Sequence, residues 1–181
     1  MNLLTRLPLR AAKIAGALAA SAALAFAGTG TASAATPSVP APLAHSTQLR
    51  PGAQPVHALD AGALRNLNTG RCIDDSGAYG LRAFGCNGMN YQYWGLYGQS
   101  NGNWVMKNGN TGRCMDDSGA YGLRAFGCNG MSYQRWEIYY NGNGTLTFRN
   151  ENTGRCIDDS GAYGLRAFGC NGMDYQQFVG Q

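Results

Sequence analysis

Histidine is scarce in this chain, because His45 and His57 are the only two and both precede residue 62. Neither has a fixed carboxylate or cysteine beside it, so we interpret both as incidental. The rest of the chain therefore has no Ser/His/Asp set for nucleophilic catalysis. Its cysteines stand 14 positions apart with no histidine nearby, which is unlike a zinc site. We expect no cofactor, no metal and no enzymatic activity.

Long hydrophobic runs are also lacking, apart from residues 14–26, which follow three cations. A transmembrane helix needs about 20 predominantly apolar residues, and this run is shorter and interrupted by polar or small residues. The small residues at 32–34 are typical of a signal-peptide cleavage site. We predict that residues 1–34 are a secretory signal peptide, and that the protein is secreted, extracellular and not inserted in a membrane.

Excess charge of one sign is absent from the remaining chain. Without the three signal-peptide cations, 11 Arg and Lys stand against 10 Asp and Glu, and these cations are spread evenly. A basic tract for nucleic acid or for an anionic membrane is therefore missing. We expect no nucleic-acid partner.

The chain after the signal peptide divides by composition into two parts. Residues 35–61 hold five prolines among Ala, Ser and Gln, which predicts a disordered linker or tail. Residues 62–181 lack sustained helical periodicity, are rich in glycine and contain Asn-Gly turns such as Asn101-Gly102. This composition predicts one domain of short strands.

A repeat with a period of 42 residues organises that domain. The segment 66–94 returns at 108–136 and at 150–178, and 24 of its 29 positions hold the same residue in all three copies. The equally long connecting segments 95–107 and 137–149 agree at only three positions. Duplication alone would leave both parts alike, so we infer that the fixed part performs a function three times.

Three units of this length favour an all-β fold, the β-trefoil, with repeats 62–103, 104–145 and 146–181. Propellers typically need four to eight blades, and the composition excludes helical repeats. We expect four strands per repeat, related by a pseudo-threefold axis. Equivalent apolar positions should fill the core: Leu64, Met106, Phe148; Ile73, Met115, Ile157; Leu81, Leu123, Leu165; and Trp94, Trp136, Phe178.

Each repeat contributes two of the six cysteines, which in an exported chain predict disulfides. Pairing inside each repeat is the economical solution, and a ring of bridges between repeats would respect the symmetry equally. The pairs predicted inside the repeats are Cys72 with Cys86, Cys114 with Cys128, and Cys156 with Cys170.

Specific motifs of the repeat resemble those of ricin-type lectins and family 13 carbohydrate-binding modules. Gln92-Tyr93-Trp94 and Gln134-Arg135-Trp136 match the Gln-x-Trp signature, and Gln176-Gln177-Phe178 is a conservative variant. The Gly-Arg-Cys-Ile-Asp and Cys-Asn-Gly runs belong to the same pattern. The compact spacing of the cysteines is most similar to that of actinohivin-like lectins. The resemblance implies a β-trefoil and non-catalytic glycan binding, with Gln92, Gln134 and Gln176 in structural roles.

The resemblance also implies binding residues in each repeat. An Asp after the first cysteine accepts hydrogen bonds from sugar hydroxyls, and an Asn after the second cysteine both donates and accepts them. These positions are Asp74, Asp116 and Asp158, and Asn87, Asn129 and Asn171.

An aromatic stacking residue is the third element of such a site. Phe84, Phe126 and Phe168 lie at the position of that residue, where the side chain either stacks on a sugar or points into the core. Tyr79, Tyr121 and Tyr163 can supply a ring from the rim instead. Actinohivin-like repeats carry a tyrosine where this chain has Arg82, Arg124 and Arg166, and each arginine either pairs with an acid or reaches an acidic glycan. We expect the second acids, Asp75, Asp117 and Asp159, to stabilise the turn as partners of that arginine or of neighbouring backbone N–H groups.

These observations predict a secreted, non-catalytic lectin with three equivalent shallow sites. The expected partners are mannose- or galactose-type glycans, with acidic ones left open by the arginines, and we expect a monomer. The paired acids are poor glycosidase candidates, because Asp74 and Asp75 should point to opposite faces of a strand. The alternatives are a protein-interaction or inhibitor trefoil, or the binding subunit of a non-covalent complex.

Overall fold

The computed structural model describes Leu43, residues 45–50 and residues 62–181. The predicted signal peptide, His57 and most of the predicted linker lie outside the described residues. No helix of the described chain is long and apolar enough to span a bilayer.

Residues 62–181 form four strands in each repeat, as predicted. The first repeat holds β2 (Gly62–Asn66), β3 (Arg71–Ser76), β4 (Gly80–Gly85) and β5 (Tyr93–Gly98). The second holds β6 (Trp104–Asn108), β7 (Cys114–Ser118), β8 (Gly122–Phe126) and β9 (Arg135–Tyr140). The third holds β10 (Leu146–Asn150), β11 (Arg155–Ser160), β12 (Gly164–Gly169) and β13 (Phe178–Gly180). Single 3-10 turns, η3 (Asn90–Gln92), η4 (Ser132–Gln134) and η5 (Asp174–Gln176), precede the last strand of each repeat.

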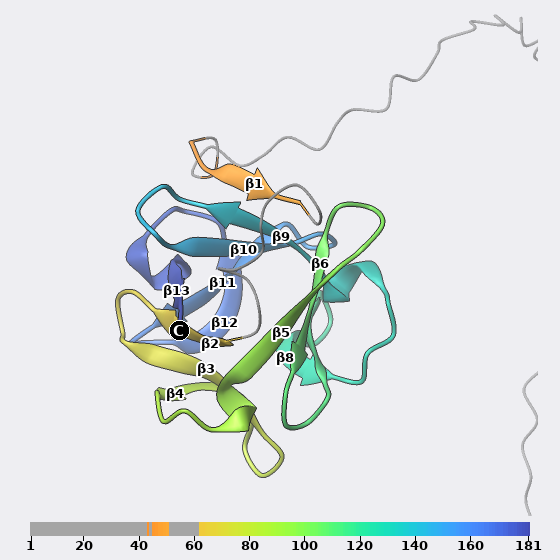
Figure 1. The fold of residues 1–181 in the computed structure, drawn as a ribbon, viewed down its shortest axis with the longest axis vertical. Helices are drawn as coiled ribbons and strands as arrows, with labels where there is room; N and C mark the ends of the chain where they lie inside the picture. The colour runs from red at the N-terminus through yellow and green to blue at the C-terminus, as the bar shows by residue number, and fades with distance from the viewer. Residues whose placement is uncertain (1–42, 44, 51–61) are drawn as a thin grey trace, which may run out of the picture. The chain divides into compact units, whose positions relative to one another are not determined.

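Six of these strands, β2, β5, β6, β9, β10 and β13, close into a barrel (Figure 1). The neighbours run β9-β10-β13-β2-β5-β6, and β6 pairs with β9 to complete the circle. The hairpins β3–β4, β7–β8 and β11–β12 lie off this path, and β4, β8 and β12 contact one another. This arrangement is the predicted β-trefoil, and closure leaves the barrel strands without long open edges.

The core lies inside the barrel and under the hairpins. The residues predicted from the repeat fill it, with Leu81, Leu123 and Leu165 partly buried at its margin. Trp104 on β6, Ile138 on β9 and Leu146 on β10 extend the same cluster.

The third repeat keeps this core full although Phe178 replaces a tryptophan. In the other copies Trp94 and Trp136 are buried and donate from the indole N–H to a backbone carbonyl, at 3.0 and 3.1 Å. Phe178 lacks that donor, and its ring packs edge-on against Phe148 at 6.0 Å between centroids. Phe148 is larger than Leu64 and Met106 at the same repeat position, so ring volume is redistributed and not lost.

A thirteenth strand corrects one prediction. The segment 35–61 was predicted to be disordered, but Thr47–Leu49 within it forms β1 and pairs antiparallel with β9. Leu43 is 1% exposed and packs against Tyr139. The Trp104 indole N–H donates to the Leu49 carbonyl at 3.0 Å. For these residues the prediction was wrong, because backbone pairing and one buried leucine give no composition signal.

Disulfides pair inside each repeat, as predicted. Cys72–Cys86, Cys114–Cys128 and Cys156–Cys170 each join residues 14 positions apart, and the described residues contain no free cysteine. Each bridge ties the start of the β3-type strand to the segment after the β4-type strand. Closing a loop of this size contributes roughly 3 kcal/mol on the chain-entropy account.

Candidate binding site

The first acid of each pair is buried beneath an arginine. Asp74 is fully buried, and Arg82, directly opposite on β4, donates from Nε to its Oδ1 at 3.1 Å. The same bond joins Arg124 to Asp116 and Arg166 to Asp158, each at 3.1 Å. Register places these partners face to face across the hairpin, so pairing follows from the sequence spacing.

Two aromatic rings enclose each of these arginines. The guanidinium carbon of Arg82 lies 4.4 Å from the ring centres of both Tyr79 and Phe84. The second and third repeats repeat this arrangement within 0.1 Å, with Tyr121 and Phe126 around Arg124, and Tyr163 and Phe168 around Arg166. Cation–π attraction to both rings helps to hold the guanidinium in place.

These rings are at the surface and not in the core. Phe84 is 46% exposed and Tyr79 is 73% exposed. The sequence left open whether Phe84 is at the surface or points into the core, and its exposure shows that its side chain points outward. Arg82 keeps 31% of its side chain exposed, and among the described residues no acceptor bonds its terminal nitrogens. Each repeat therefore presents a guanidinium edge to solvent between two aromatic rings.

Gln92 connects this arrangement to the loop after β4. Its amide nitrogen donates to Asp74 Oδ2 at 3.2 Å and to the Gly85 carbonyl at 2.9 Å. Its amide oxygen accepts from the Asn87 backbone N–H at 2.8 Å. Gln134 and Gln176 make the same three contacts in their repeats. The structure thus gives this glutamine a structural position of the kind expected.

The Asn87 side chain is exposed but bonded locally. Its oxygen accepts from the Met89 N–H at 3.1 Å, and its nitrogen donates to the Tyr91 hydroxyl at 3.2 Å. Asn129 repeats both contacts, and Asn171 repeats the first. Asp74 and Asn87 are connected through Gln92, not across an open pocket. Direct sugar contacts by the Asp and Asn positions stay predictions, and in this structure no oxygen of the Asp74 carboxylate reaches the surface.

The second acid of each pair binds the next repeat, which corrects the expected partner. Asp75, Asp117 and Asp159 were expected to bond the arginine of their own hairpin or nearby backbone. Instead Asp75 accepts from Arg113 Nε at 3.0 Å and from the Thr111 hydroxyl. Because side chains alternate along a strand, adjacent acids face different neighbours.

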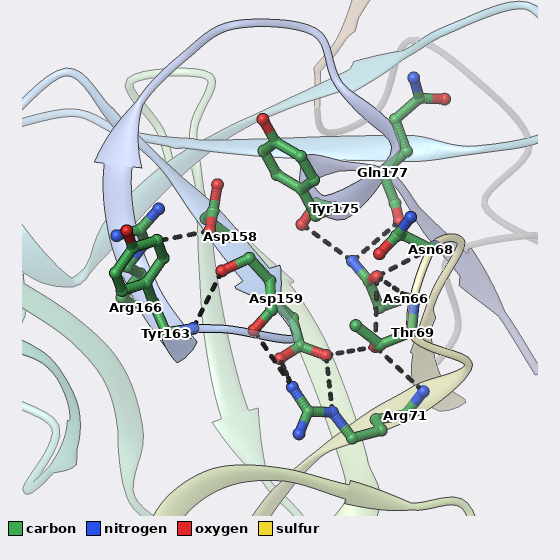
Figure 2. Close-up of polar contacts among 11 residues, drawn as sticks. Asn66, Asn68, Thr69, Arg71, Asp158, Asp159, Tyr163, Arg166, Tyr175 and Gln177 are labelled. Carbon is green, nitrogen blue, oxygen red and sulfur yellow. Dashed lines mark hydrogen bonds and ion pairs between the residues drawn. The ribbon is translucent and has the colours of Figure 1, made fainter.

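We call these contacts, in which the second acid of one repeat bonds an arginine and a threonine of another, a clamp. The clamp occurs three times, and the third one connects the last repeat to the first. Asp117 bonds Arg155 and Thr153, and Asp159 bonds Arg71 and Thr69. Figure 2 shows the third clamp, with Arg71 and Thr69 both directed at Asp159, while Asp158 is bonded to Arg166 on the other side of the strand. Thr69 and Arg71 were not singled out from the sequence, although both are unchanged in all three copies.

No group of three or more His, Cys, Asp or Glu side chains suited to hold a metal ion occurs within the described part of the chain. The buried acids are already bonded to arginine, threonine or glutamine. The guanidinium of each repeat can donate charge-assisted hydrogen bonds to a ligand, and the two rings beside it offer apolar surface.

Comparison with solved structures supports the fold. A designed threefold symmetric protein, ThreeFoil, superposes with a TM-score of 0.60 at 19% identity, covering 66% of this chain and 96% of that one. The hemolytic lectin CEL-III gives 0.58 at 26% identity, covering 68% of this chain and 30% of that one. An exo-beta-1,3-galactanase from Clostridium thermocellum gives 0.60 at 21% identity, covering 66% and 29%. This chain thus matches less than a third of the latter two proteins.

No curated protein matches the sequence. Residues 60–178, however, match the family described as the ricin-type beta-trefoil lectin domain. That match spans all three repeats, and the barrel, the three hairpins and the repeated disulfides agree with it. The chain belongs to the ricin-type beta-trefoil lectin domain family.

Proposed function

We propose that this protein is a secreted, non-catalytic lectin that binds glycans at three equivalent shallow sites, one in each repeat. Membership of the lectin family suggests carbohydrate binding. The observation that carries the three-site proposal is the repeated arginine between two exposed rings. Arg82, Arg124 and Arg166 occupy equivalent positions with nearly identical surroundings.

The geometry favours an acidic glycan over the neutral mannose- or galactose-type ligand of actinohivin-like lectins. In those lectins the carboxylate after the first cysteine contacts sugar hydroxyls. Here Arg82 covers Asp74 and takes one of its oxygens, while Gln92 takes the other. The surface group is therefore a donor with positive charge, which suits a sugar carboxylate or sulfate held by two parallel N–H bonds.

The two rings complete each proposed site. Tyr79 and Phe84 flank the guanidinium, and the C–H face of a pyranose can bury apolar area against either ring, at about 25 cal/mol per Å². Single sites of this shallow kind are expected to bind with millimolar to micromolar dissociation constants. Three sites on one body gain 10² to 10⁴ in avidity toward a repeating glycan if simultaneous engagement is possible.

Secretion and the monomeric state belong to the same proposal. The apolar run after three cations supports secretion, and three disulfides fit an oxidising compartment. A one-sided protein interface would not need the exposed residues to be repeated on all three lobes, so the lectin proposal is preferred over an interaction or inhibitor module.

Stepwise replacement of Arg82, Arg124 and Arg166 by Gln tests this function on an array of neutral, carboxylated and sulfated glycans at two salt concentrations. We expect binding to acidic glycans to fall with each replacement and to weaken with salt. Arg50→Gln removes one exposed charge outside the repeats and serves as the matched control. Unchanged acidic binding in the triple variant would overturn the arginine sites, and salt-independent binding to neutral glycans alone would overturn the acidic ligand.

A further inference from the structure

A hollow of about 400 Å³ lies beside the paired strands β5 and β6 and the segment that follows β6, and none of the three arginines lines it. Tyr93, Tyr97 and Lys107 line it, together with the short segment from Asn108 to Gly112. Tyr93 is 46% exposed and Tyr97 is 55% exposed, and Lys107 is exposed as well. A volume of this size is in the range of small-ligand sites.

Two glycines open the hollow. A Cβ at Gly95 would lie 2.9 Å from Tyr97 Cε2, and a Cβ at Gly109 would lie 3.2 Å from Tyr93 Cδ1. A side chain at Gly95 would therefore collide with the Tyr97 ring, and one at Gly109 would press on the Tyr93 ring, so both rings keep their positions on the lining because glycine lies beside them. We call the place where two successive repeats meet a junction; the first comprises β5, β6 and residues 109–112, and the second comprises β9, β10 and residues 151–154. The 42-residue period places Glu137 and Glu151 of the second junction at the positions of Gly95 and Gly109.

The second junction shows what fills this space when glutamates are present. Glu137 accepts from Arg149 at 2.7 Å and from the Tyr139 hydroxyl at 2.9 Å. Glu151 accepts from Arg135 Nε at 2.6 Å. Lys107 is the counterpart of Arg149, yet within the described chain it has no ion pair. The first junction thus keeps the cation and lacks both carboxylates.

The third junction is apolar where the first is open. Val179 and Leu67 stand at the positions of Gly95 and Gly109, and Arg65 stands at the position of Lys107. Arg65 donates from Nε to the Gly70 carbonyl at 3.3 Å. The pseudo-threefold symmetry therefore supplies two internal controls. In the described chain, the first junction combines a hollow, two exposed rings and a lysine without an ion pair, whereas the second has glutamates bonded to its arginines and the third has Val179 and Leu67 at the glycine positions.

From this comparison we propose that the hollow is a fourth binding site, unlike the other three, for a single acidic sugar residue of the hexuronate class. Lys107 meets the carboxylate, in the place that Glu137 occupies relative to Arg149 at the second junction. Tyr93 and Tyr97 offer ring faces to the C–H groups of the pyranose and hydroxyls to its oxygens. Asn110, also on the lining, adds an amide that can donate to and accept from sugar hydroxyls.

The site is tested by titrating the ¹⁵N-labelled protein with D-glucuronate, and in parallel with D-glucose and with acetate. We expect glucuronate to shift the backbone N–H signals of Gly95, Gly109 and Gly112, because all three glycines line the hollow. Glucose has the pyranose ring but no carboxylate, and acetate has the carboxylate but no ring. Each should therefore bind at least about tenfold more weakly than glucuronate. Equal shifts with acetate would overturn the sugar assignment.

Variants separate this site from the three proposed lectin sites. Lys107→Gln should weaken glucuronate binding in the hollow by about tenfold, whereas Arg65→Gln, the matched change at the third junction, should not. Gly95→Glu recreates the filled second junction and should abolish the shifts. Unchanged affinity in Lys107→Gln, a change at an exposed side chain without an ion pair in the described chain, would overturn the proposal.

The triple variant lacking Arg82, Arg124 and Arg166 distinguishes the two proposals. The hollow should bind glucuronate in that background with unchanged affinity, even if the lectin sites are lost. Loss of the glycine shifts in the triple variant would show that binding depends on the arginines, and would overturn a separate fourth site.

Discussion

The two adjacent acids of each repeat do different work although both are fully buried. Asp74 bonds an arginine and a glutamine of its own repeat, and orients the guanidinium that we place in the binding site. Asp75 bonds an arginine and a threonine of the next repeat. Alternation along one strand thus assigns one acid to the proposed binding surface and its neighbour to the joining of repeats.

Asp74→Asn should lower stability by about 2 kcal/mol, because it leaves the guanidinium of Arg82 beside a neutral amide in a mostly buried setting. The estimate is below the cost of breaking a fully buried pair, since Arg82 is 31% exposed. Urea denaturation at pH 7 measures the change. Asp174→Asn, an exposed acid outside these contacts, should stay within about 0.5 kcal/mol of the unchanged protein. Equal loss in both variants would contradict this role of Asp74.

Glu151 should make stability depend on acid pH. Its hydrogen bond with Arg135 lowers the pKa of the carboxyl below the usual 4.5, and contacts with Asn103 and Asn101 lower it further. A lowered folded pKa stabilises the protein fully above the unfolded value, and this contribution is lost as pH falls through the folded pKa. The stability difference between the unchanged protein and Glu151→Gln should therefore shrink as pH falls below 4.5. A constant difference from pH 7 to pH 3 would contradict the pairing.

At the scale of strands and hairpins, repetition in the sequence carried most of the information. Positions such as Ile73 and Trp94 could be assigned to the core because each recurs with the same character at the same place in every copy. The cysteine pairing and the face-to-face position of Arg82 and Asp74 follow from spacing within one hairpin. Contacts between repeats could not be predicted, because spacing along the chain does not say which neighbour a strand meets.

β1 could not be predicted from the sequence either, for a different reason. It occurs once, so no internal comparison identifies it, and its pairing with β9 uses backbone groups that every residue has. Its consequence is nonetheless large for one side chain. Tyr139, which lies under Leu43, is 2% exposed, whereas Tyr97, the equivalent residue without such a cover, is 55% exposed.

Removal of residues 1–50 should expose Trp104 and shift the protein's fluorescence to longer wavelength. Trp104 is 4% exposed, and its indole N–H donates to Leu49, which β1 provides. Trp94 and Trp136 are held in the core by their own hydrogen bonds and should not respond. The same truncation in a Trp104→Phe background is the control and should leave the emission unchanged. A shift that persists in that background would contradict the assignment to Trp104.

The burial of Tyr139 also predicts an alkaline effect. Burial, then the charge of Glu137 and a hydrogen bond to it, raise the pKa of Tyr139 to about 12. Because the unfolded chain ionises this tyrosine near 10, its contribution to stability is complete below pH 10 and falls as pH rises toward 12. Tyr139→Phe should lose less stability than the unchanged protein over that interval, as measured by urea denaturation. An identical alkaline loss would contradict the raised pKa.

Across the whole molecule, the second acids form a closed circuit of clamps between repeats. The first two join residues 38 positions apart, and the third joins Asp159 to Arg71 over 88 positions. This last clamp connects the final repeat to the first, beside the pairing of β13 with β2. The trefoil is thus held together by three contacts of the same chemistry, one of which spans most of the domain.

If the three repeats unfold as one cooperative unit, loss of the long-range clamp should lower the free energy of unfolding as much as loss of either shorter clamp. Asp75→Asn, Asp117→Asn and Asp159→Asn should each cost about 2 kcal/mol, and the three losses should agree within about 1 kcal/mol. Tryptophan fluorescence reports on the first two repeats, where Trp94, Trp104 and Trp136 lie, whereas far-UV circular dichroism reports on all strands. The two signals should therefore change at the same urea concentration in every variant. A separate, earlier transition in the dichroism of Asp159→Asn alone would instead mean that the third repeat opens by itself, so that the clamp to Arg71 joins units which fold independently.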